Sequence, residues 1–243
     1  MSRPTLTPLA RAGLAALAAV TFVHLGAVVG DPDGLVANVT QDLLMPLLAW
    51  SLVAATRSPR SRLVRLVLLA LGFSWLGDAV PDFAPGDTAF LVMVGFFLLA
   101  QATYIAAFLP FRDRSIVRRA PLAVVPYAAA FGALIALTRD GAGSLLVPVV
   151  VYGLALMTMA VLATGLGRLT AWGGAIFMLS DALIAINAFT DLELPAHGLW
   201  VMLTYVAGQA LIALGVVGHE ERRRETDTEH ERTGEPQGTS SSR

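Results

Sequence analysis

The chain contains no cysteine and no lysine. The absence of cysteine excludes disulfides, thiolate metal sites and a cysteine nucleophile. Because lysine is absent, all 17 basic residues are arginine, and a retinal-type Schiff base, which needs a lysine amine, is excluded. A rhodopsin-like photoreceptor is therefore ruled out, although the number of apolar segments would suit one.

Charge is scarce as well. Only 14% of the 243 residues are charged, whereas 56% are hydrophobic, and a soluble domain has about 25% charged residues. The mean hydropathy is +0.67. The sequence thus predicts an integral membrane protein, which we expect in the inner (plasma) membrane of a bacterium.

Familiar catalytic motifs are missing too. The sequence has no G-x-S-x-G, H-E-x-x-H, P-loop or dinucleotide-binding motif. The four histidines are too few and too peripheral for a metal site, and we expect no metal and no cofactor. Carboxylate acid–base chemistry is the chemistry that remains.

The apolar residues gather into eight stretches, and a helix needs about 20 such residues to cross the hydrocarbon core. We therefore expect an all-α, polytopic fold with eight transmembrane helices. A signal peptide is the alternative for the first stretch. The candidate spans are 9–29, 37–56, 65–83, 88–109, 120–138, 144–165, 170–189 and 197–218.

Arginines mark alternate loops. They concentrate in 57–65, in 110–119 and at 222–224, whereas 29–37, 83–88 and 190–196 hold acidic residues and no arginine. Positive residues favour the cytoplasm, so we expect both termini there. Residues 1–218 are the predicted transmembrane domain, and 219–243 the predicted disordered, charged cytoplasmic tail. Its arginines are an orientation signal, and we expect no nucleic-acid partner.

Two of the spans carry an aspartate deep inside, Asp78 and Asp181. A charged side chain at the bilayer centre costs about 2.5–3.5 kcal/mol on insertion scales. We interpret the pair as catalytic residues that line one cavity and exchange protons with a substrate; helix packing is the alternative. Polar residues on the same or neighbouring spans are candidates for binding substrate or supporting the aspartates: Ser74, Asp82, Gln101, Tyr104, Ser180, Asn187, Tyr205 and Gln209.

The positions of these residues hint at an internal repeat. Asp78 is followed on the next span by Gln101, and Asp181 is followed on the next span by Gln209. Halves of four helices each would run in the same direction, so the repeats would be parallel and related by an axis along the membrane normal.

Two segments resemble the YhhN / TMEM86 family, the lysoplasmalogenases. Residues 173–189 read GGAIFMLSDALIAINAF, and residues 201–212 read VMLTYVAGQALI. Looser similarity covers 74–78 and 101–105, and the resemblance spans roughly 35–215. Two departures stand out, since Thr40-Gln41-Asp42 replaces a frequent Thr-Lys-Pro and Gln101 replaces a frequent histidine.

The resemblance implies an eight-helix membrane enzyme that hydrolyses the vinyl ether of lysoplasmalogens. The products would be a fatty aldehyde and glycerophosphocholine or glycerophosphoethanolamine, and the partner a lysophospholipid drawn from the bilayer. The two membrane aspartates of the family fall on Asp78 and Asp181.

The chemistry of a vinyl ether suits two carboxyl groups. One acid would protonate the carbon β to the ether oxygen, and one carboxylate would stabilise the cation and activate water, as in glycoside hydrolysis. The sequence leaves open which aspartate is the acid, and it leaves the oligomeric state open. A proton-coupled transporter and a structural or receptor-like membrane protein remain as alternatives.

Overall fold

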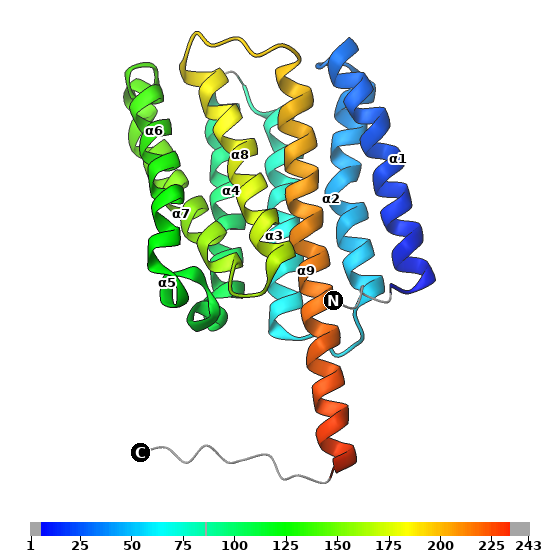
Figure 1. Cartoon of the computed structure of the whole chain (residues 1–243). Coiled ribbons are helices and arrows are strands. Elements are labelled where there is room, and N and C mark those ends of the chain that lie inside the picture. The colour runs from blue at the N-terminus through cyan, green and yellow to red at the C-terminus, as the bar shows by residue number, and fades with distance from the viewer. Residues whose placement is uncertain (1–5, 86, 234–243) are drawn as a thin grey trace.

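A computed structural model describes residues 6–85 and 87–233, and this part of the chain contains helices and no strands (Figure 1). Seven helical stretches within it are long and apolar enough to cross a membrane. The prediction of an all-α integral membrane protein is therefore confirmed.

In residues 6–85 and 87–233, eight long helices and several short ones follow one another, and each predicted span overlaps one long helix. Their bounds are α1 (Pro8–Gly30), α2 (Leu35–Ala55), α3 (Arg62–Ala79), the 3-10 helix η1 (Val80–Phe83), α4 (Asp87–Phe108), η2 (Leu109–Arg114), α5 (Ile116–Arg119), η3 (Pro121–Val124), α6 (Val125–Ala142), η4 (Gly143–Leu145), α7 (Leu146–Ala163), α8 (Arg168–Phe189) and α9 (His197–Thr233).

One of the seven apolar helical stretches, residues 121–163, contains both α6 and α7. These helices fold back on each other through η4, as Figure 1 shows at the upper left. Gly143 begins this turn with φ +49°, a left-handed conformation that glycine adopts without steric cost. Within the pair, a Cβ added at Gly153 would lie 2.5 Å from the ring of Phe131.

α8 and α9 pack against each other more extensively than any other pair. Glycines permit this contact, because a Cβ added at Gly173 would lie 2.8 Å from the carbonyl oxygen of Gly208. A Cβ added at Gly208 would lie 2.9 Å from the backbone nitrogen of Phe177. Small residues let helix backbones approach closely in membranes. α9 also touches α1, α2 and α3, so it is the central element of the bundle.

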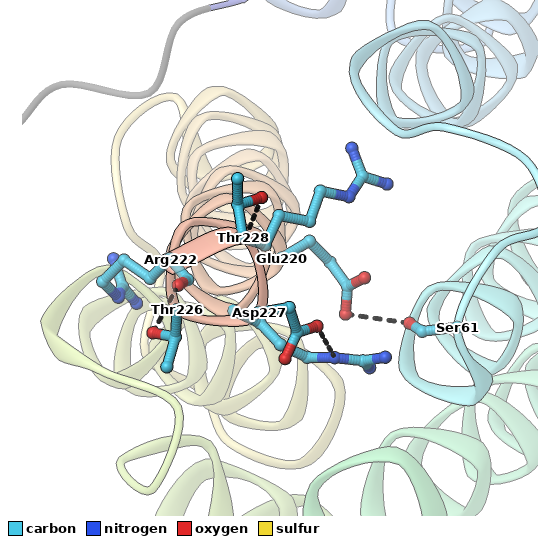
Figure 2. Close-up of polar contacts among 8 residues, drawn as sticks. Ser61, Glu220, Arg222, Thr226, Asp227 and Thr228 are labelled. Carbon is cyan, nitrogen blue, oxygen red and sulfur yellow. Dashed lines mark hydrogen bonds and ion pairs between the residues drawn. The ribbon is translucent and has the colours of Figure 1, made fainter. Parts of the chain in front are cut away.

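α9 continues well past the other helices (Figure 1). The sequence predicts a disordered tail from residue 219, but α9 is helical to Thr233; residues 234–243 lie outside the described part. Glu220 is buried and accepts a hydrogen bond from the Ser61 hydroxyl at 2.9 Å, which joins α9 to the start of α3 (Figure 2). Arg223 and Asp227 pair one turn apart, 3.9 Å between Nε and Oδ2. The domain boundary at 218 stays a prediction.

Candidate active site

Each intramembrane aspartate accepts a hydrogen bond from a tyrosine. Asp78 on α3 is 8% exposed, and the Tyr205 hydroxyl of α9 donates to its Oδ2 at 2.7 Å. Asp181 on α8 is 9% exposed, and the Tyr152 hydroxyl of α7 donates to its Oδ2. One ring, that of Phe97, packs against Tyr205 and also lines a cavity with Tyr152 and Asp181. The fold therefore brings both aspartates into one region, each held by a phenol.

A second polar network lies next to Asp78. Gln209 on α9 accepts a hydrogen bond from the Tyr104 hydroxyl at 2.6 Å and donates one to the Ser74 hydroxyl at 3.0 Å. Ser74, Tyr104 and Gln209 are all fully buried. This chain of contacts ties α3, α4 and α9 together one helical turn below Asp78, and polar contacts of this kind hold helices in register inside a membrane.

Phe97 lies beside both aspartate–tyrosine pairs. Its ring packs edge-on against Tyr205, with centroids 5.8 Å apart, and against Phe177 at 6.4 Å. Its approach to α3 depends on Gly77, because a Cβ there would lie 2.8 Å from the Phe97 ring. The same ring also lines the cavity beside Asp181. Phe97 is thus a shared neighbour of Tyr205, which holds Asp78, and of the cavity beside Asp181.

The cavity beside Asp181 has a volume of about 50 Å³. It lies between α4, α7 and α8, and Asp181 and Tyr152 are its polar side chains. Its other lining residues are apolar: Phe90, Met93, Val94, Phe97, Val149, Ile184, Ala185 and Phe189. Two of these, Phe90 and Phe189, meet edge-on with ring centroids 5.5 Å apart. A carboxyl group in such surroundings can exchange a proton with an apolar ligand while little water competes.

The remaining sequence candidates take different positions. Ser180 is buried and donates to the carbonyl oxygen of Val201 at 3.0 Å, so it joins α8 to α9. Asn187 lies in the last turn of α8 and is exposed. Asp82 is exposed on η1, although it interacts electrostatically with Asp78, as does Asp42 on α2.

Gln101 is fully buried on α4. Among the described residues, neither polar atom of its side-chain amide has a partner.

Tyr152 is the member of the site that sequence reasoning missed. It stands in the run Val149-Val150-Val151-Tyr152, which is otherwise apolar. A hydroxyl in such a run is a weak signal, because tyrosine is also common as a packing residue. Its role depends on a contact with α8, 29 positions further along the chain, and no spacing rule relates the two.

The largest hollow among those described lies far from the aspartates. It has a volume of about 760 Å³ and is bounded by Thr7 at the start of α1, the end of α2 and the extension of α9. Arg57 and Arg224 alternate there with Glu221 and Glu225. Such a mixed, open surface suits hydration, and we do not place the active site there. In the described part of the chain, no three His, Asp or Glu side chains are arranged to hold a metal ion.

Comparison with known proteins supplies the context for this site. The lysoplasmalogenase TMEM86B of Sus scrofa is 38% identical over 130 residues, which is 53% of this chain and 54% of that protein. The human and rat proteins of the same name are 38% identical over 73 and 74 residues. The chain spans about half the length of the pig protein and about a third of the other two. No solved structure matches it.

Family assignment rests on a longer match. The sequence profile of the YhhN family matches residues 37–216. This range begins in α2, ends in α9, and includes both aspartates and both tyrosines that hold them. The chain therefore belongs to the YhhN family.

Proposed function

We propose that this protein is a membrane hydrolase that cleaves the vinyl ether bond of lysoplasmalogens, with choline or ethanolamine headgroups, by aspartate acid–base catalysis. The observation that carries the proposal is Asp181, held by Tyr152, beside an apolar cavity between α4, α7 and α8. The relatives named lysoplasmalogenase support the choice of substrate. The catalytic residues in this proposal are Asp78 and Asp181.

The reaction needs a proton donor and a proton acceptor. A carboxylic acid gives its proton to the carbon β to the ether oxygen, and the electrons of the double bond form the new C–H bond. The oxocarbenium ion that results is stabilised by a nearby carboxylate. Water then adds to the carbon that bears the oxygen, and a carboxylate takes its proton. The hemiacetal collapses by C–O cleavage to a fatty aldehyde and the glycerophospho headgroup.

The surroundings of this site favour an amphiphilic substrate. The cavity is lined almost entirely by apolar side chains, so it favours a hydrocarbon chain over a charged group. Its volume of about 50 Å³ is smaller than a lipid tail, so entry requires movement of the side chains that line it. The substrate would enter sideways from the bilayer.

The proposed topology has eight crossings with both termini in the cytoplasm of a bacterium. α6 and α7 have 18 residues each and would each span about 27 Å, close to the hydrocarbon core of about 30 Å. Figure 1 places the loop after α2 and the extension of α9 at one end of the bundle, and arginines concentrate in both. The aspartates then lie nearer the opposite, outer face.

One assay tests the proposal directly. Purified protein in detergent should release fatty aldehyde from lysoplasmenylethanolamine and leave the saturated alkyl-ether analogue intact, because the analogue has no double bond to protonate. Uptake of substrate by sealed vesicles, with no aldehyde release in detergent, would instead support a proton-coupled transporter built on the same aspartates. Equal cleavage of both ethers would rule out the proposed chemistry.

A further inference from the structure

The cavity beside Asp181 is smaller than the substrate of the proposed hydrolysis. Its volume is about 50 Å³, whereas ligand pockets usually measure about 300–1,000 Å³. Side chains therefore occupy part of the site in this structure, and at least one of them gives up its place when substrate binds. Such a side chain should line the cavity and also reach the second aspartate, because the proposed reaction uses both carboxyl groups.

The ring of Phe97 meets both conditions. It lines the cavity together with Asp181 and Tyr152. Among the described aromatic rings that line this cavity, it is the one that also packs against Tyr205, with centroids 5.8 Å apart. The Tyr205 hydroxyl in turn donates to Oδ2 of Asp78 at 2.7 Å. The space that the ring fills thus extends from the cavity to the tyrosine that holds the second aspartate.

The surroundings of this ring allow another group to take its place. A Cβ added at Gly77 would lie 2.8 Å from the ring, so whatever replaces the ring meets the backbone directly before Asp78. Met93 lies one turn before Phe97 on α4 and also lines the cavity. Because methionine is flexible and packs against irregular shapes, Met93 and Phe97 form a wall of the cavity that can change shape.

We propose that Phe97 is a specificity-determining residue, whose ring fills the place that the vinyl ether of the substrate takes during catalysis. When the ring is displaced, the cavity extends to Tyr205. The double bond then lies between the carboxyl group of Asp181 and the hydroxyl that holds Asp78. This inference rests on the proposed hydrolysis, keeps its chemical steps, and adds to it the part of the site that reaches the second aspartate.

Displacing the ring costs free energy, and this cost lowers the affinity for substrate. The ring gives up its edge-on contacts with Tyr205 and Phe177, and such reorganisation is subtracted from the binding free energy. A variant in which the space is already open does not lose this free energy. Truncation of Phe97 should therefore tighten binding, although truncation of a packed ring ordinarily only destabilises a protein.

The test measures equilibrium binding of a radiolabelled, saturated alkyl-ether lysophosphoethanolamine, which has no double bond to cleave, to the whole protein in detergent. Phe97→Leu should bind it about tenfold more tightly than the parent, the effect expected from two aromatic contacts. Phe97→Trp enlarges the ring and should bind it more weakly. A residue with a packing role alone would give no gain in affinity with either substitution.

Phe108→Leu is the matched control. Phe108 is a fully buried phenylalanine of the same helix, it stacks on Tyr104, and it is not among the residues that line the cavity. Its truncation should lower the thermal midpoint at least as much as Phe97→Leu does, because its ring is the more deeply buried of the two. Its affinity for the alkyl-ether lipid should stay parental.

The outcomes separate this inference from the function on which it rests. If the parent releases aldehyde but Phe97→Leu binds the alkyl-ether lipid no more tightly than the parent, the role of Phe97 is refuted and the hydrolysis stands. A collapse of the fold in Phe97→Leu, with Phe108→Leu intact, would show a packing role and would also overturn the inference. If the parent releases no aldehyde, the proposed hydrolysis fails, and the place assigned to the vinyl ether fails with it.

Discussion

Replacing each intramembrane aspartate by asparagine is the sharpest test of the acid–base proposal. Asn keeps the size of Asp, and its carbonyl can still accept the hydrogen bond from Tyr205 or Tyr152, but it cannot give or take a proton. General acid–base help is worth about 10²–10⁴-fold, which corresponds to about 2.7–5.5 kcal/mol of transition-state stabilisation. We expect turnover in Asp181→Asn and Asp78→Asn to fall by at least about 100-fold.

Stability should move differently from activity. Both carboxyl groups are more than nine-tenths buried, and burying an ionisable group costs more than burying a neutral amide. The free energy of unfolding should therefore hold or rise in both variants, and a thermal melt in detergent measures it. Loss of turnover with unchanged stability would identify a chemical role for the carboxyl group.

The assay compares initial rates of aldehyde release at saturating lysoplasmenylethanolamine. Asp191→Asn is the matched control, because this aspartate is exposed in the loop between α8 and α9, and it should keep parental turnover. The acid–base reasoning is refuted if both intramembrane variants hydrolyse the substrate at parental rates.

Three further outcomes follow from the contacts. Tyr152→Phe removes the hydroxyl that donates to Asp181. Because a hydrogen bond to a charged group is worth about 1.5–3 kcal/mol, turnover should fall by about 10–150-fold. An unchanged turnover would exclude a role for the phenol. Gly208→Val forces α9 away from α8 and should lower the free energy of unfolding by about 1–3 kcal/mol, which a thermal melt measures. Gly95 has open space around it, so Gly95→Val is the control and should melt like the parent. Because the chain has no cysteine, Asp33→Cys and Ser58→Cys give labelling free of background, and an impermeant maleimide should reach the two from opposite sides of the membrane; labelling from one side would refute the proposed topology.

The sequence was most informative at residues whose burial in a membrane costs free energy. Aspartates and glutamines inside apolar helices must find partners or a cavity, so Asp78, Asp181 and Gln209 could be singled out without a structure. Each predicted span also overlaps one long helix, because a helix that crosses the bilayer needs about 20 apolar residues. These predictions depend on composition and local order, which a sequence records directly.

Tertiary partners could not be predicted in the same way. The pairing of Asp181 with Tyr152, and the position of Phe97 beside both tyrosine–aspartate pairs, depend on how helices rotate and tilt against one another. Ser180 and Asn187 illustrate the limit of helix periodicity. Seven residues apart, they lie on the same face of α8, yet the first is buried and the second exposed, since a face is covered only where a neighbouring helix extends.

The charged composition after residue 218 led to a prediction of disorder, yet this segment is helical to Thr233. Composition alone ignores contacts such as that between Ser61 and Glu220, which anchors the first turn beyond the bundle. It also ignores pairs one turn apart, such as Arg223 with Asp227, which favour a helix that has already begun.

α9 is long enough to connect the interior of the bundle with the exposed extension beyond it. Its 37 residues extend about 55 Å, so a single rigid rod runs from Tyr205 and Gln209 inside the bundle to the exposed extension. Side-chain tips lie about 5–6 Å from a helix axis, so a twist of about 20° would shift the Tyr205 hydroxyl by about 2 Å. That shift would break its 2.7 Å hydrogen bond to Asp78. A rotation of the extension about the axis of α9 would thus change the hydrogen bonding of Asp78.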